Sequence, residues 1–218
     1  MLTALTAVLF DMDGTITDTE AHYVHAFDRL AAAAEVRLTK AHHQAVVGAS
    51  FESMAETAER AGIAGTRREI IAAIEAAVLD GIRGSEPVWQ PGALELVAQL
   101  RAAGVATALV TMSYRSLADE VVARIPFEAF DVIVTGDEVE RGKPHPDAYL
   151  RAAERLGVDI ADCVVIEDSA TGVAAGLAAG ARVIAVPFYL PLPESDDYTL
   201  WPDGLARRGV NDVVHGVR

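Results

Sequence analysis

The sequence predicts an α/β protein: a doubly wound, mostly parallel (Rossmann-like) sheet with an all-helical cap domain inserted after the first strand. The run at residues 4–10 is apolar on both faces, which is typical of a strand in a parallel sheet covered by helices. From residue 86 onward, short apolar runs alternate with helical patterns, as in successive βαβ units. Between these two parts, residues 18–85 carry helical patterns and no convincing strand.

The elements can be placed in order along the chain. The first strand ends in the polar turn Asp11-Met-Asp-Gly-Thr15. In the insertion, Ala, Glu and Arg dominate and turn signals occur only at 47–50 and 61–65, which predicts helices at 19–34, 39–46, 51–61 and 66–83. Beyond a break rich in Gly and Pro, the predicted helices are 92–103, 114–123, 146–156 and 170–179, and the predicted strands are 105–110, 131–135, 163–166 and 182–186.

This order divides the chain into two expected domains. A catalytic α/β core would comprise residues 1–17 and 86–218, and a helical cap would comprise 18–85. The tail from residue 187 is rich in Pro and Asp and resists assignment, but we expect its aromatic residues to pack on the core: Tyr189, Tyr198 and Trp201.

Composition excludes several classes of protein. Of 218 residues, 51% are hydrophobic, which is ample for a packed core, and 18 basic against 32 acidic residues give a net charge of −14. Such an acidic balance argues against nucleic-acid binding. No apolar segment is long enough to predict a membrane span. A single cysteine, Cys163, excludes an internal disulfide and suits a reducing cytoplasm, where we expect a monomer or small homo-oligomer.

Polar side chains follow four of the predicted strands. In a parallel sheet these strand ends share one edge, so we expect the side chains to converge there. Clustered carboxylates raise one another's pKa unless a cation is present, and oxygen ligands favour Mg²⁺. A cation, an ammonium group and hydroxyl donors together suit a phosphoryl group. The residues are Asp11 and Asp13, Thr111 and Ser113, Lys143, and Glu167 and Asp168.

Each of these signals alone has an ordinary structural explanation. The two aspartates after the first strand fit a turn, the hydroxyls fit helix N-caps, and a lone lysine fits a solvated surface. Their order and their placement at four strand ends make the combined structural explanation improbable.

The motifs resemble those of the haloacid dehalogenase superfamily, in the branch of the β-phosphoglucomutase-like phosphatases with a helical cap after the first strand. Asp11-Met-Asp-Gly-Thr15 is similar to the first motif, and Thr111 stands at the hydroxyl of the second. The segment 142–147, Gly-Lys-Pro-His-Pro-Asp, matches the third, and Glu167-Asp-Ser169 is similar to the fourth. The resemblance covers essentially the whole chain except the tail.

The resemblance implies a reaction. Asp11 would be the nucleophile that forms an aspartyl-phosphate, and Asp13 would be the acid and base. Mg²⁺ would be held by Asp11, the Asp13 main-chain carbonyl, Asp168 and, directly or through water, Glu167. Phosphoryl oxygens would be bound by Thr111, Ser113 and Lys143. The expected function is that of a Mg²⁺-dependent phosphatase acting on small phosphorylated metabolites, sugar phosphates among them.

The cap would select the substrate, and here the chain departs from the mutase pattern. A gap-free reading puts Tyr23 where a mutase has its cap histidine, with His22 one position away, and Phe51 where an arginine follows the glycine turn. Tyr23, His22 and Phe51 are therefore the candidate specificity residues.

Two alternatives remain open at this stage. One is a phosphosugar mutase of the β-phosphoglucomutase type. The other is a receiver-like domain that is phosphorylated on aspartate for signalling, although such a domain needs neither an acid at Asp13 nor a 68-residue cap.

Overall fold

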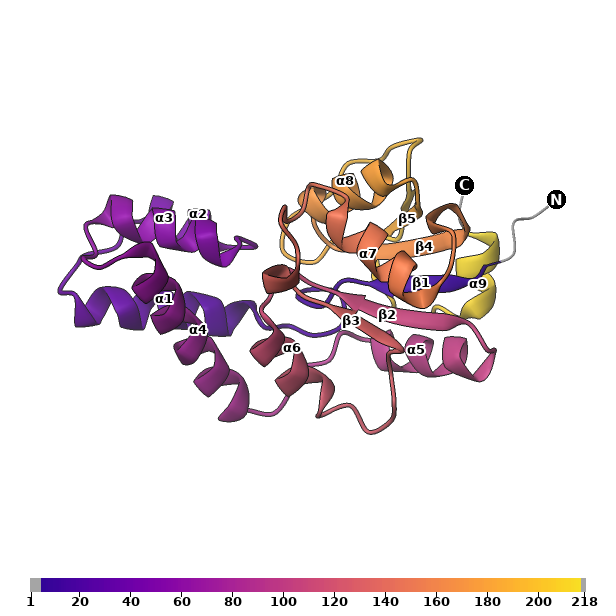
Figure 1. Ribbon diagram of the computed structural model, residues 1–218, viewed down its shortest axis with the longest axis horizontal. Coiled ribbons are helices and arrows are strands. Elements are labelled where there is room, and N and C mark those ends of the chain that lie inside the picture. The colour runs from indigo at the N-terminus through magenta and orange to yellow at the C-terminus, as the bar shows by residue number, and fades with distance from the viewer. Residues whose placement is uncertain (1–4, 217–218) are drawn as a thin grey trace.

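The computed structural model describes residues 5–216, which form a parallel sheet flanked by helices and a second group of helices at one end (Figure 1). The sheet has the order β3-β2-β1-β4-β5-β6, and every neighbouring pair is parallel. The strands are β1 (Ala7–Phe10), β2 (Ala106–Val110), β3 (Val132–Val134), β4 (Cys163–Glu167), β5 (Arg182–Ala185) and β6 (Thr199–Leu200). The predicted fold class is confirmed.

Alternating side chains of β1 face two hydrophobic layers. Val8 and Phe10 pack with apolar residues of α5 (Ala93–Ala102), α6 (Arg115–Val122) and α9 (Val210–His215). Ala7 and Leu9 face the opposite layer, which contains α7 (Asp147–Leu156) and α8 (Ala170–Ala179). Because helices cover both faces, β1 is buried along its whole length, as its continuous apolar sequence indicates. Two 3₁₀ turns, η1 (Gly136–Glu138) and η2 (Ile160–Asp162), complete these connections.

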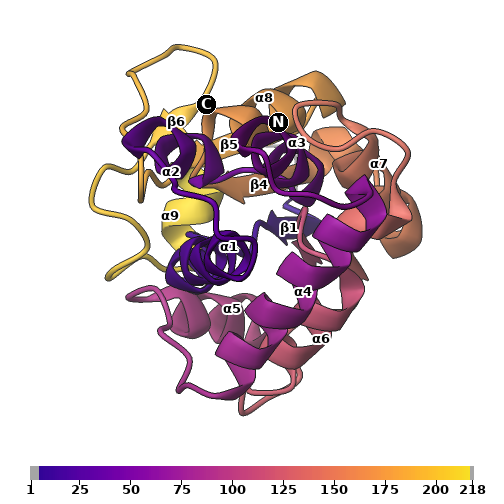
Figure 2. The same cartoon turned by 90° about the vertical axis from the view of Figure 1, so that its left-hand side faces the viewer.

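Four helices lie between β1 and α5, as predicted: α1 (Glu20–Ala33), α2 (Lys40–Val46), α3 (Phe51–Ala61) and α4 (Arg67–Arg83). They lie beyond the carboxyl ends of the strands, and Figure 2 views the molecule from their side. Local sequence fixes their ends: Thr66 and Glu69 form a capping box at the start of α4, and Gly62 ends α3 with a left-handed φ of 92°. The exact division of the chain at residues 18 and 85 stays a prediction.

The helical group touches the core at its rim. Tyr114 in the core donates a hydrogen bond to Glu52 of α3 at 2.8 Å and packs its ring edge-on against Phe51, 4.7 Å between centroids. Ser116 of α6 donates to Glu75 of α4 at 2.6 Å. The helices therefore cover the sheet edge at which the predicted site residues lie.

The tail contains two elements that the sequence did not predict, β6 and α9. Tyr198 and Trp201 are buried on the core, as expected. Tyr189 instead lies at the base of α1, where its hydroxyl donates to the Asp18 carboxylate and accepts the Glu20 N–H. Within residues 5–216, no helix is both long and apolar enough to cross a membrane.

Candidate active site

The turn after β1 carries two aspartates into the space between the sheet and the helical group. Gly14 has a φ of +90°, and a Cβ at this position would lie 2.2 Å from Asp168 Oδ2. Glycine is thus required here for both its conformation and its size. This close approach brings the ends of β1 and β4 together.

Lys143 binds the Asp11 carboxylate from the loop before α7. Its Nζ donates to Asp11 Oδ1 at 2.7 Å, to Glu167 Oε1 at 2.6 Å and to the Val110 carbonyl at 2.9 Å. An ammonium group has three donors, so these three acceptors satisfy it. All three side chains are almost fully buried, Lys143 being 4% exposed. The ion pairs therefore fix the position of Asp11 with little competition from water.

Glu167 accepts four hydrogen bonds. Besides Lys143, its Oε1 accepts the Tyr149 hydroxyl at 2.8 Å, and its Oε2 accepts the Ser169 hydroxyl at 3.0 Å and N–H at 3.2 Å. These donors occupy both carboxylate oxygens. In this arrangement Glu167 holds Lys143 in place.

Three carboxylates have the placement of a cation site. Oxygen atoms of Asp11, Glu167 and Asp168 lie within 4.8 Å of one another. Burial, opposed in part by Lys143, raises the pKa of Asp11 to about 8, and burial and the nearby charge of Asp11 raise that of Asp168 to about 9. A bound cation would remove this penalty, and an all-oxygen donor set fits a hard ion.

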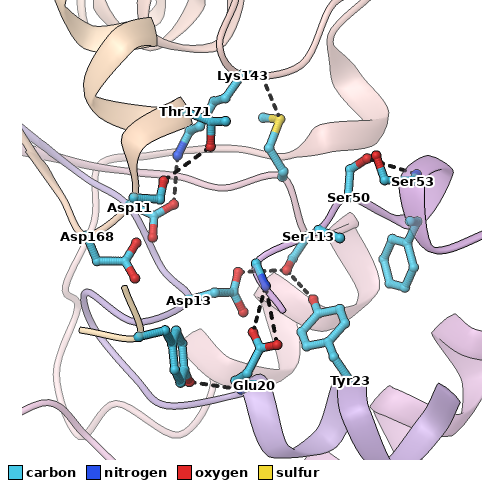
Figure 3. Close-up of a pocket in the computed structure, with 16 residues that line it drawn as sticks. Asp11, Asp13, Glu20, Tyr23, Ser50, Ser53, Ser113, Lys143, Asp168 and Thr171 are labelled. Atoms are coloured by element: carbon cyan, nitrogen blue, oxygen red, sulfur yellow. Dashed lines mark hydrogen bonds and ion pairs between the residues drawn. The ribbon is translucent and has the colours of Figure 1, made fainter. Parts of the chain in front are cut away.

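Asp13 lies on the opposite side of the space from Lys143 (Figure 3). Its Oδ2 accepts hydrogen bonds from Thr111 Oγ1 at 2.9 Å and Ser113 Oγ at 2.8 Å, and its Oδ1 accepts one from the Thr19 hydroxyl. Both predicted phosphate-binding hydroxyls thus contact Asp13. Ser113 also lines the cavity, whereas Thr111 is fully buried behind it.

The cavity bounded by these residues measures about 220 Å³. Asp11, Asp13, Lys143 and Asp168 line its core side, and the predicted cap residues Tyr23 and Phe51 line the other. Tyr23 shares a hydrogen bond with Ser113. The volume lies below the range of about 300–1,000 Å³ for drug-sized ligands, so the cavity suits a small substrate.

His22 does not reach this cavity. Its ring lies against Gly81, and its Nε2 is 3.4 Å from the Ser85 hydroxyl. Successive helix residues point about 100° apart, so Tyr23 faces the cavity while His22 faces α4.

The lining residues that were not predicted from the sequence include Glu20 and Tyr189. Both Glu20 carboxylate oxygens lie 3.3 Å from the Gly48 N–H that they accept. Burial raises the pKa of Glu20 to about 7 despite that bond. Its acidity was visible in the sequence, but an acid in a first helical turn is common and gave no signal of a site.

Comparisons with known proteins agree with this geometry. A family model described as haloacid dehalogenase-like hydrolase matches residues 5–180. Hexitol phosphatase A of Escherichia coli (strain K12) is 39% identical over 82% of this chain and 81% of its own length. The bifunctional riboflavin kinase/FMN phosphatase of Arabidopsis thaliana is 50% identical, but the match covers 44% of this chain and only 26% of that protein. CbbY from Rhodobacter sphaeroides, solved with phosphate, superimposes with a TM-score of 0.82 at 27% identity, over 94% of this chain and 97% of CbbY.

Proposed function

We propose that this chain, which belongs to the haloacid dehalogenase-like hydrolase family, is a Mg²⁺-dependent phosphatase that hydrolyses small phosphorylated metabolites through an aspartyl-phosphate on Asp11. The observation that carries the proposal is the buried Asp11 carboxylate, bound by Lys143 beside Asp168 and facing the cavity. The activity for which the Escherichia coli hexitol phosphatase A is named supports a sugar or polyol phosphate as substrate.

The reaction has two steps. In the first, the Asp11 carboxylate attacks phosphorus, the bond from phosphorus to the leaving oxygen breaks, and Asp13 gives its proton to that oxygen. In the second, a water molecule attacks the same phosphorus, Asp13 takes its proton, and the bond to Asp11 breaks to release phosphate. The bonds from Thr111 and Ser113 hold the Asp13 carboxyl toward the leaving group.

Lys143 and Ser113 line the cavity and are proposed to bind phosphoryl oxygens. Lys143 would at the same time hold Asp11 through its bond to Oδ1. Thr111 stays a prediction as a phosphate ligand, since its observed bond to Asp13 equally supports a role in positioning the acid.

Asp11, Asp168 and the main-chain carbonyl of Asp13 would hold Mg²⁺. These residues suit a cation because the Asp11 and Asp168 carboxyls are buried close together and the pKa of each is raised. The four donors on Glu167 favour a contribution through water rather than direct ligation. When bound, Mg²⁺ supplies positive charge that offsets the charge of the phosphoryl oxygens.

A phosphosugar mutase remains the weaker alternative. Its acid–base cycle calls for a cap histidine, and among the described residues that line the cavity none is a histidine. The predicted cap of residues 18–85, a cytoplasmic location and a monomeric or small homo-oligomeric state stay expectations.

The test is phosphate release from a panel of phosphate esters with Mg²⁺, including β-glucose 1-phosphate with glucose 6-phosphate measured alongside. Asp11→Asn should lower kcat by at least about 10⁴-fold, because an amide is a poor nucleophile. Asp28→Asn, on the exposed surface of α1, is the matched control and should retain activity. Appreciable turnover by Asp11→Asn, or isomerisation faster than phosphate release, contradicts the proposal. A long-lived phosphorylated Asp11 would favour the receiver-like alternative.

A further inference from the structure

The cap side of the cavity carries a negative charge and, among the described lining residues, no basic side chain. Its polar members are Glu20, Ser50 and Ser53, and its apolar surface comes from Tyr23 and Phe51. Lys143 is the one basic residue in the lining, and it lies on the core side beside Asp11. The one ammonium group in the lining therefore lies at the core side, and the cap side carries only the negative charge of Glu20.

Glu20 is held so that its carboxylate stays on the cavity wall. At its main chain, the N–H donates to the Tyr189 hydroxyl at 3.2 Å. At its side chain, the carboxylate accepts the Gly48 N–H from the turn before α3. In Figure 3 the Glu20 carboxylate points from the helix side into the space that Asp13 also borders.

The position of Glu20 determines which part of a substrate it meets. The phosphoryl group belongs at Asp11 and Lys143, and its leaving oxygen belongs at Asp13, so the remainder of the ester extends toward the cap. A carboxylate can accept about four hydrogen bonds, and Gly48 supplies one N–H. Because Glu20 lines the cavity, the rest of that capacity is available to a leaving group bound there.

We propose that Glu20 is a specificity-determining residue that selects phosphate monoesters with an uncharged, hydroxyl-bearing leaving group and rejects esters that carry a second phosphate. This inference rests on the proposed phosphatase function. Substrate hydroxyls donate to Glu20, and the C–H faces of the leaving group pack on Tyr23 and Phe51. A second phosphate would face Glu20 with no lysine or arginine among the described lining residues to compensate, so like charges repel at short range.

Burial is the first cause that raises the pKa of Glu20 to about 7, so this carboxyl is mostly ionised, and repels a second phosphate, above that pH, and the esters are compared at pH 8. In such surroundings a second negative charge is screened less than at the surface.

The experiment compares two esters that share a carbon skeleton, fructose 6-phosphate and fructose 1,6-bisphosphate, by phosphate release with Mg²⁺. We expect kcat/KM to be at least about 100-fold higher for the monophosphate. In Glu20→Gln this ratio should shrink at least about 10-fold, mainly through a lower KM for the bisphosphate, because the amide keeps an acceptor for Gly48 but loses the charge. Glu56→Gln removes the same charge from the exposed face of α3 and should leave the ratio unchanged.

A second variant keeps the inference testable if Glu20→Gln fails to fold. Ser53 is exposed and lines the cavity, and Ser53→Lys adds a cation to its cap side. It should lower the KM for the bisphosphate at least about 10-fold.

Equal kcat/KM values for the two esters in the parent protein, or a ratio that neither variant changes, overturn the role of Glu20 and leave the phosphatase function standing. Absence of phosphate release from every ester, p-nitrophenyl phosphate included, overturns the phosphatase function and the inference with it.

Discussion

Gly172 lies directly against the Glu167 carboxylate, and its replacement by alanine tests the whole network behind Asp11. A Cβ at this position would lie 1.7 Å from Glu167 Oε1 and 2.1 Å from Oε2, whereas real Cβ contacts stay above 3.0 Å. The φ of Gly172 is not in the left-handed region, and the residue belongs to the first turn of α8. The substitution therefore adds volume without straining the backbone. To restore a contact of at least 3.0 Å, the Glu167 carboxylate has to move by more than 1 Å, which is enough to break its hydrogen bonds.

The cost follows from the bonds that this movement breaks. Glu167 is fully buried and accepts from Lys143 and Tyr149 through Oε1. Each bond to a charged group contributes about 1.5–3 kcal/mol, and alanine returns about 1 kcal/mol of helix propensity. We expect Gly172→Ala to lower the free energy of unfolding by about 2–5 kcal/mol. Because displaced Glu167 releases Lys143, and with it Asp11, kcat/KM should fall at least about 100-fold.

Urea denaturation measures the stability, and phosphate release by the folded protein measures the activity. Gly176→Ala in the same helix is the matched control. Its Cβ would meet the apolar atoms Val183 Cγ2 at 2.9 Å and Val165 Cγ1 at 3.1 Å, so it should lose stability while kcat/KM stays within about threefold. A Gly172→Ala protein that is as stable and as active as the parent refutes the reasoning.

Three further predictions concern the acids around the sheet edge. Tyr149→Phe should lower the free energy of unfolding by about 1–3 kcal/mol and reduce kcat, since buried Glu167 loses one donor; unchanged urea midpoint and kcat would contradict this. In chelator-treated protein, the affinity for added Mg²⁺ should rise between pH 6 and 9, and calorimetry should show protons released on binding. The reason is that ligation needs Asp11 and Asp168 ionised, whereas their pKa values are raised to about 8 and 9. A Mg²⁺ affinity independent of pH would argue against this site. Burial opposes ionisation of Glu138, but bonds from Arg155 and the Thr135 N–H and the charge of Arg115 lower its pKa to about 2. The stabilisation by ionised Glu138 is therefore present above pH 4.5 and lost as the pH falls toward 2. Over that range the free energy of unfolding of the parent should fall by about 1–2 kcal/mol more than that of Glu138→Gln. Identical acid denaturation of the two proteins would count against this role.

Sequence reasoning could place the strands and the side chains at their ends, because parallel strands present their carboxyl ends at one edge. Asp11, Lys143, Glu167 and Asp168 meet there, as that rule predicts. It could not predict which partner each polar group would choose. Thr111 donates to Asp13 and does not line the cavity, and the sequence carries no local signal for the orientation of this side chain.

The helical insertion and the tail show the same limit. Tyr23 and His22 are adjacent in sequence, and only the angle at which α1 enters decides which of them faces the cavity. Strand β6 has two residues, which are too few for a periodic signal. Tyr189 donates its hydrogen bond to Asp18, which lies 171 positions earlier in the chain. Contacts of that range carry no local signature.

The order of the strands has a consequence for how the chain is made. Strand β1 emerges first yet lies between β2 and β4, whose partner residues are 106–109 and 163–166. At roughly 5–20 residues per second, about 8–30 s separate the synthesis of β1 from that of β4. Helices α1 and α4 pack on each other and can meet long before then. A ribosome that stalls before residue 163 thus presents an apolar strand with one open edge, a target for chaperones and for misassociation with other nascent chains.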